Sequence, residues 1–503
     1  MPHESLSPED ATLLVATDPR AQLQIGAVCF FDGAPLRDGQ GRLRLHDLRS
    51  HIEARLGMSP RFRQRVATIA FDAARPVWLD DEAFDIANHV RAHTLPAPGG
   101  RQGLRDFLRE LLSGPLDPDR PLWEAWVVDG IVDDTTEGTT VDDDPSDDRV
   151  AVVLRVHHVM ADGLSLLDAA LLLLDAEPHD HPDEPTAWKA EPTPGTDRLL
   201  LEALAARTRH QVAIALGALG ALASMADPRR ALGGLRTVAG TVAGTATSGI
   251  ATAPALPLNG RVGTRRDFTW ASLSMPDLVE VKRAQKTTLN DVVLAVVAGA
   301  LKRHLGSDEA AALAEHPPRV LVPVGSFDAA ETGEAGNAFS IMVTELPFDT
   351  DDPLEQLADI HAQMDQLKDG GQSSASSSLF SVIDLLPLPL LRRLGPLALS
   401  RQPFVNLAVT NIPGSRSPAY LLGARMHELH PIVTGVGNIA LIIGVLSYVD
   451  HMGVGITVDP DVVEDPDGLL ADIEDAAAAL VEASRRKGKA KGKAKSTRRV
   501  STK

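Results

Sequence analysis

Apolar residues are spaced along this chain in two ways, one typical of strands and one of helices. Residues 121–129 and 150–156 are short and mainly apolar, and the second run holds a single charged residue. Such a run predicts a strand that is buried on both faces. Between the two runs, residues 133–148 are rich in Asp, Thr and Gly, which predicts a disordered, solvated loop that lets the two strands pair antiparallel.

Further patterns extend over most of the chain and predict both helices and strands. Helices are expected at residues 48–56, 164–177, 198–225 and 290–305. Strands are expected at residues 319–324, 341–346, 405–410 and 439–448. This mixture predicts a mixed α/β architecture in two lobes of similar size.

Changes in composition suggest where these lobes begin and end. The expected units are an N-terminal lobe, a helical crossover or linker, a C-terminal lobe and a basic tail, at residues 1–185, 186–264, 265–484 and 485–503. The linker begins in a stretch rich in Pro, Asp and Glu. The Lys-Gly-Lys-Ala-Lys tail is of low complexity, and we expect it to be disordered.

Composition narrows the class of protein. With 503 residues, of which 44% are hydrophobic, the chain can bury a large core without disulfides. The single cysteine, Cys29, lies in an apolar run, which predicts a buried thiol in a reducing compartment. Residues 1–10 contain no apolar segment, so we expect no secretory signal and a cytoplasmic location. The longest uncharged apolar stretch, residues 212–226, is shorter than the roughly 18 residues that a membrane span needs.

The charge distribution argues against specific nucleic-acid binding by the folded lobes. The net charge is −19, although residues 485–503 contain many Lys and Arg and no acid. The rest of the chain is therefore more acidic still. A nucleic-acid-binding domain would instead present a basic face.

Several common catalytic signatures are absent from the sequence or lie in an unsuitable context. Neither a Gly-x-Ser-x-Gly elbow nor a Walker A loop occurs. Residues 435–440 match the dinucleotide-binding pattern, but a strand-like run follows where a helix would be needed. His179 and His181 have no third ligand near them in the sequence, so we expect no metal site there.

Two adjacent histidines, His157 and His158, follow the predicted strand 150–156 directly. Neighbouring residues of a strand point to opposite sides, so one imidazole should face the core and the other a cleft. Asp162 is positioned to orient an imidazole or to pair with a basic residue such as Arg155, and Gly163 allows close approach of chain or ligand. The residues alone leave a structural and a catalytic role both open.

The pattern His-His-x-x-x-Asp-Gly resembles the active-site motif of the CoA-dependent acyltransferase superfamily, which includes chloramphenicol acetyltransferase and the condensation domains. The wider chain resembles the bacterial wax ester synthase/diacylglycerol acyltransferase branch, because other blocks follow in the same order from Leu6 to Ala483. These blocks are residues 6–11, 84–89, 113–117, 121–124, 257–260, 290–295, 336–337, 410–414 and 446–448. One block differs, since Gly325-Ser326-Phe327 stands where the family more often has Ser, an aliphatic residue and Arg.

This resemblance implies two chloramphenicol acetyltransferase-like lobes with the active site in a channel between them. It implies that His158 is the general base that deprotonates an acceptor hydroxyl, which then attacks the acyl-CoA thioester without a covalent acyl-enzyme. An imidazole, with a pKa near 6.5, suits this task at neutral pH. His157, Asp162 and Gly163 would hold the shape of the site. Acyl-CoA is a co-substrate, and no cofactor or metal is implied.

The resemblance also suggests residues that line the substrate channel. Pro121, Leu122 and Trp123 either line the acyl or acceptor channel or belong to the core. Asn290 and Asp291 match a family motif near the active site, but Thr288 to Asp291 ahead of an apolar helix is also a capping box.

The acceptor implied by the resemblance is diacylglycerol, a long-chain alcohol or both. Such lipids dissolve poorly in water, so we expect peripheral contact with a membrane or lipid droplet through residues 199–225 or 379–399. Helices buried within or between the lobes fit those two segments equally well. Two other hypotheses stay open, a non-catalytic lipid-binding scaffold of the same fold and an acyltransferase for another alcohol.

Overall fold

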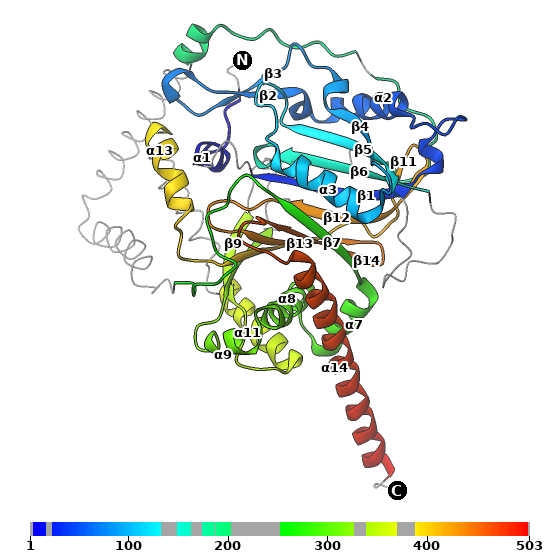
Figure 1. Ribbon diagram of the computed structural model, residues 1–503, viewed down its shortest axis with the longest axis vertical. Coiled ribbons are helices and arrows are strands. Elements are labelled where there is room, and N and C mark those ends of the chain that lie inside the picture. Colours follow the sequence, from blue (N-terminus) through cyan, green and yellow to red (C-terminus); the bar gives the residue numbers. More distant parts are fainter. Residues whose placement is uncertain are drawn as a thin grey trace, which may run out of the picture.

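The computed structural model describes most of the chain. It contains two six-stranded sheets with helices packed against them (Figure 1). The described residues are 4–16, 23–131, 148–161, 174–185, 187–202, 252–325, 339–369 and 388–500. None of the helices within these ranges is long and apolar enough to cross a membrane.

The first sheet has six strands in the order β11-β12-β1-β6-β5-β4. Their bounds are β1 Gln24–Asp32, β4 Val90–Thr94, β5 Trp123–Ile131, β6 Arg149–His157, β11 Tyr420–Leu421 and β12 Ala424–Val433. The predicted strands at 121–129 and 150–156 are confirmed as β5 and β6, which pair antiparallel. Strand β6 is buried from its second residue to its last, as its apolar run predicts. The loop expected at 133–148 lies almost wholly outside the described residues.

The second sheet also has six strands, in the order β7-β14-β13-β10-β8-β9. Their bounds are β7 Asp267–Ser274, β8 Arg319–Gly325, β9 Phe339–Glu345, β10 Leu407–Ile412, β13 Leu441–Tyr448 and β14 His451–Val458. The four strands predicted in this region are confirmed as β8, β9, β10 and β13. Strand β10 runs parallel to β8 and β13, whereas the other pairs are antiparallel.

Helices cover the outer face of the second sheet and one face of the first (Figure 1). The longer ones are α1 Pro8–Ala16, α2 Leu45–Arg55, α3 Gly100–Ser113, α7 Met275–Gln285, α8 Leu289–Leu305, α9 Ser307–Ala312, α11 Pro353–Asp369, α13 Leu388–Leu399 and α14 Pro466–Val500. Short 3-10 turns are η1 Ala34–Leu36, η2 Leu56–Met58, η3 Pro60–Arg63, η4 Ala70–Asp72, η5 Ile86–Asn88 and η6 His158–Ala161. A small hairpin pairs β2 Gln64–Ala67 with β3 Val77–Asp80. The helices predicted at 48–56 and 290–305 are confirmed as α2 and α8.

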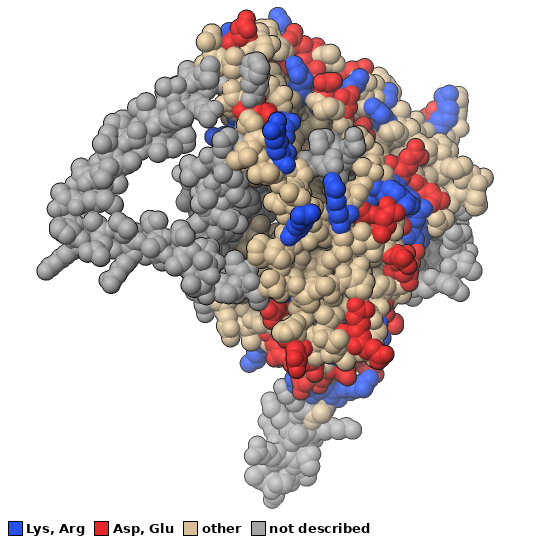
Figure 2. Space-filling model, turned by 60° about the vertical axis from the view of Figure 1, so that its left-hand side comes forward, with Lys and Arg blue, Asp and Glu red and all other residues tan. Residues whose placement is uncertain are grey.

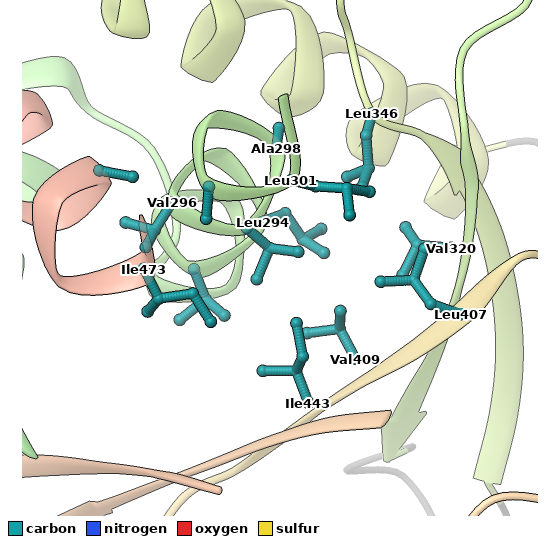
Figure 3. Packing of buried hydrophobic residues seen from close by; sticks show 14 of the residues in the cluster. Leu294, Val296, Ala298, Leu301, Val320, Leu346, Leu407, Val409, Ile443 and Ile473 are labelled. Carbon is teal, nitrogen blue, oxygen red and sulfur yellow. The ribbon is translucent and has the colours of Figure 1, made fainter. Parts of the chain in front are cut away.

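The largest core lies between helix α8 and the second sheet. Figure 3 shows Leu294 and Leu301 of α8 directed towards Val320, Leu407 and other residues of the strands, while Ile473 of α14 closes one side. Helix α8 is apolar all round because α7, α11 and α14 enclose it as well.

Strand β12 belongs to the C-terminal half of the chain but lies beside β1 in the first sheet. It also packs across β13 and β14 of the second sheet. The predicted boundary at residue 265 therefore does not separate the strands of the two sheets. Glycines permit this contact, because a Cβ atom on Gly453 would lie 1.9 Å from the Leu429 carbonyl oxygen and one on Gly455 would lie 2.0 Å from that of Pro431.

An ionic cluster joins the two lobes at another place. Arg105 and Arg109 of α3 pair with Asp267 of β7 at 2.9 and 3.0 Å. Arg105 also pairs with Asp467 at the start of α14. Burial opposes the charge of Asp267, but the two guanidinium groups outweigh it and hold the pKa of this carboxyl below its ordinary value.

The prediction of a disordered tail from Arg485 is wrong, because helix α14 continues to Val500. Ala, Lys and Arg are good helix formers, so low complexity here does not prevent a helix. The Arg485 guanidinium also bonds to Asp277 at 2.6 Å and Glu280 at 2.7 Å, both on α7. The last turns of α14 project from the body (Figure 1).

The close contact between β12 and β14 predicts that Gly453→Ala lowers stability. The added methyl group meets a backbone carbonyl that cannot move without shifting β12, and such overpacking costs about 1 to 3 kcal/mol. A lower urea midpoint of unfolding would show this loss. Gly57→Ala is the matched control, since no atom lies within 4 Å of its added methyl group. Equal midpoints for the two variants would contradict the prediction.

Candidate functional site

The tandem histidines lie where strand β6 gives way to the short turn η6. His157 is the last residue of β6 and pairs with Gln24 of β1, and His158 is the first residue of η6. The backbone N–H of His157 donates to the Leu122 carbonyl at 2.9 Å, and that of His158 donates to the Leu23 carbonyl at 2.9 Å. The residues that directly precede β5 and β1 thus hold the backbone of both histidines in place.

His157 faces the interior. Its side chain is buried, and its Nδ1 accepts a hydrogen bond from the Val159 N–H at 3.3 Å. Burial, and to a smaller extent the neighbouring His158, lower the pKa of His157 to about 3. The imidazole is therefore neutral at pH 7. The prediction that one of the pair faces the core is confirmed for His157.

His158 is half-buried. Its Nδ1 is shielded from solvent and has no hydrogen-bond partner among the residues that the structure describes. Burial lowers the pKa of His158, so this imidazole is also neutral at pH 7 and has the capacity to accept a proton. Asp162 and Gly163, predicted to complete the motif, lie outside the described residues, as do residues 164–173 of the helix predicted at 164–177. The last four residues of that predicted helix are described and are not helical, since Asp175 forms an isolated bridge with Tyr420.

Arg155, two residues before His157, has an acidic partner that the sequence analysis missed. Its Nη2 lies 2.8 Å from Glu124 Oε2, and the guanidinium also donates to the Leu111 and Gly114 carbonyls. Glu124 stands directly opposite Arg155 in the antiparallel register of β5 and β6. The register shifts between Val128 and Ile131, so counting out from the loop would have placed Glu124 opposite Val156 and not Arg155. The Arg155–Glu124 pair anchors the end of β6 against α3.

Pro121, Leu122 and Trp123 are all buried at the start of β5, next to the end of β6. The indole N–H of Trp123 donates to the Phe62 carbonyl at 2.8 Å, and its ring stacks on His89 with centroids 4.7 Å apart. His89 in turn stacks on Phe84 and donates through Nδ1 to the Trp123 carbonyl at 2.8 Å. These contacts support the core role, and a channel-lining role remains a prediction.

Asn290 and Asp291 lie in the first turn of α8, in the second lobe. The predicted capping box is confirmed, because Asp291 N–H donates to Thr288 Oγ1 at 3.2 Å and Thr288 N–H donates to Asp291 Oδ2 at 2.8 Å. Asp291 Oδ2 also lies 2.8 Å from His361 Nδ1, a partner 70 residues away that no sequence spacing indicates. None of these contacts joins Asp291 to the first lobe. Its role at the active site remains a prediction.

Helix α1 packs against η6 and so lies beside His158. Ser7 caps the N-terminus of α1, because its hydroxyl accepts a hydrogen bond from the Asp10 N–H at 3.1 Å. Leu6 and Ala11 share one apolar cluster with Val159 and Met160 of η6. The N-terminal block noted in the sequence therefore forms part of the surroundings of the site.

Cys29 is a poor candidate for a nucleophile. It lies in the core on β1, as predicted, and burial raises the pKa of its thiol to about 12. The reactive thiolate is therefore disfavoured at neutral pH.

Comparison with known proteins identifies the family. The wax ester synthase/diacylglycerol acyltransferase catalytic domain matches residues 6–293, and the C-terminal domain of the same family matches residues 335–480. A probable diacylglycerol O-acyltransferase of Mycobacterium tuberculosis is 30% identical over 485 residues, which cover 95% of this chain and 96% of the relative.

Solved structures share the two-lobed fold. A wax ester synthase/diacylglycerol acyltransferase of Marinobacter aquaeolei matches with a TM-score of 0.65 at 22% identity, over 96% of this chain and 99% of the other. The trichothecene 15-O-acetyltransferase of Fusarium sporotrichioides matches with a TM-score of 0.56 at 11% identity, over 96% and 94% of the two chains. The chain therefore belongs to the wax ester synthase/diacylglycerol acyltransferase family and is an acyltransferase.

Proposed function

We propose that this enzyme transfers a long acyl group from acyl-CoA to the hydroxyl of diacylglycerol, of a long-chain alcohol or of both. The products are triacylglycerol and wax ester. The observation that carries the proposal is a neutral, half-buried His158 at a rigid strand end, within a matched catalytic domain of this family. The Mycobacterium tuberculosis relative, named for diacylglycerol acylation, supports the acceptor class.

The reaction needs one proton to move twice. His158 takes the proton from the acceptor O–H as that oxygen attacks the thioester carbonyl, which forms the new C–O bond. The C–S bond then breaks, and the protonated His158 returns the proton to the leaving sulfur of CoA. A positioned base of this kind contributes about 10²- to 10⁴-fold in rate.

His157 is better suited to positioning than to proton transfer. Its imidazole faces the core, and its Nδ1 is already engaged by the Val159 N–H. That bond fixes the turn from which His158 extends. Asp162 and Gly163 are proposed to complete the shape of the site.

The acceptor is the least constrained part of the proposal. The same fold occurs in a trichothecene O-acetyltransferase and in a starter condensation domain of rhizomide synthetase solved with C8-CoA, at a TM-score of 0.52. The O-acetyltransferase favours another alcohol as the second candidate acceptor. A panel of diacylglycerol, hexadecanol and short alcohols with one acyl-CoA donor distinguishes these acceptors.

We further propose that the enzyme works in the cytoplasm at the surface of a membrane or lipid droplet, as a peripheral protein. Its proposed substrates reside in that surface rather than in water. Binding in the interface plane needs only an amphipathic element and no spanning helix. A purely scaffolding role on such a surface would leave the neutral His158 without a use.

The base role predicts that His158→Ala lowers kcat by about 10²- to 10⁴-fold, equal to about 3 to 5 kcal/mol of barrier. The measurement is release of free CoA and formation of ester from palmitoyl-CoA with diacylglycerol or hexadecanol. His451→Ala, at a histidine that is 46% exposed, is the control for removal of an imidazole elsewhere. Full ester formation by His158→Ala would rule out the base role.

The lowered pKa of His158 predicts where activity falls on the acid side. A base works only when neutral, and burial keeps His158 neutral below its ordinary pKa of about 6.5. Activity should therefore be level as the pH falls from 7.5 to 6.5 and decline only at lower pH, as His158 takes up a proton. The profile of kcat against pH tests this. A decline centred at or above pH 6.5 would mean that the titrating group is not a buried imidazole.

A further inference from the structure

Helix α13 carries an exposed row of leucines. Leu390, Leu394 and Leu397 are 43%, 52% and 48% exposed, and Phe404 just beyond the helix is 42% exposed. The three leucines are spaced at i, i+4 and i+7, so they lie on one side of the helix. The buried residues Leu391 and Gly395 lie on a different side, about 100° or more round the helix from Leu390. Helix α13 is therefore amphipathic, with a second apolar stripe facing outwards.

Basic residues accompany this exposed stripe. Residues 388–399 contain two arginines and no acid, although the whole chain carries a net charge of −19. Arg393 lies one turn from Leu390 and Leu397, and Arg401 follows one turn later; both are exposed and neither forms an ion pair with a described residue. Figure 2, which brings the α13 side of the molecule forward, shows blue side chains set in a largely uncharged surface.

The inner side of α13 is connected to His158. Leu391 packs with Val15 of α1, and α1 in turn packs against η6, which begins with His158. A surface that binds α13 therefore contacts a helix that packs, through α1, against the turn η6 that begins with His158.

A second connection leads to His157. The end of α13 lies against Gly437, where a Cβ atom would be 2.3 Å from the Leu399 carbonyl oxygen. Thr434, three residues before Gly437, accepts from the Gln24 N–H through its hydroxyl at 2.7 Å. Gln24 is the register partner of His157. The first part of α13 is thus linked to His158 through one element, α1, and its end is linked to His157 through two, the segment 434–437 and strand β1.

We propose that α13 docks the enzyme on an anionic phospholipid surface. The leucines enter the boundary between headgroups and acyl chains, while Arg393 and Arg401 lie among the lipid phosphates. A basic stripe beside exposed leucines, on a body whose net charge is negative, is complementary to an anionic lipid surface. The acidic body of a second copy would attract the same stripe, and the test below distinguishes the two occupants. The inference rests on the proposed function in one respect, because it places the lipid acceptor next to the site it must enter.

Vesicle co-sedimentation of the full-length protein tests this docking. Vesicles of phosphatidylcholine with phosphatidylglycerol are compared with vesicles of phosphatidylcholine alone, and the wild type should bind the anionic vesicles more tightly. Arg393→Glu with Arg401→Glu should weaken that binding at least about 10-fold, since each cation adds up to about 5-fold near an anionic surface. Leu394→Ser with Leu397→Ser should weaken it by a similar factor.

Matched controls lie on other exposed elements. Arg486→Glu with Lys487→Glu makes the same change of charge on α14, and Met58→Ser removes an apolar side chain that is 64% exposed. Both should bind anionic vesicles as the wild type does. Circular dichroism and thermal melting verify that every variant is folded, which is expected because all the replaced side chains are exposed.

Three results would overturn the docking role of α13. The first is that the wild type binds both vesicle types equally. The second is that only the α14 variant loses binding. The third is that light scattering shows a dimer and that the double leucine variant is a monomer. Ester formation in detergent micelles separates this inference from the proposed function. The α13 variants should keep wild-type kcat there, whereas a wild type that forms no ester would refute the catalytic role and leave the vesicle results to decide on α13.

Discussion

The contact of β12 with both sheets is the constraint on which the rest of the structure depends. Strand β12 pairs with β1 in the first sheet and packs across β13 and β14 of the second. Glycines at positions 453 and 455 allow the backbones to approach so closely. Strand β1 is then held between β12 and β6. Strand β6, which ends in His157, is therefore held in place through β1 by β12, which comes from the other half of the chain.

Burial sets the chemistry of the histidine pair. Transfer of a charged imidazolium out of water is unfavourable. Burial therefore lowers the pKa of both histidines and keeps their rings neutral at pH 7. The two rings differ in what surrounds them, because His157 is fully enclosed whereas His158 begins a short turn and remains half-buried. The backbone N–H groups of the two histidines donate to the carbonyls of the residues just before β5 and β1, and these hydrogen bonds keep the turn in place. Rigid positioning of a neutral base is what general base catalysis requires.

Helix α13 extends this arrangement to the surface. A strongly acidic body favours solubility of the chain but repels anionic lipid. The basic, leucine-rich stripe of α13 would overcome that repulsion locally. Helix α13 also packs against α1, through Leu391 and Val15. Docking and catalysis would thus be coupled through ordinary side-chain packing. No residue of α13 needs to reach the reacting atoms.

The sequence by itself determined the strand before His157, the capping box at Thr288, the burial of Cys29 and the family resemblance, because each depends on local periodicity or on short ordered blocks. Only the tertiary structure decided that β12 joins the first sheet, that Asp291 meets His361, and that α14 continues as a helix past Arg485. It also decided that the leucines of α13 face outwards. These features depend on contacts between residues far apart in the chain, or on which side of a helix finds a partner, and spacing along a sequence does not specify either.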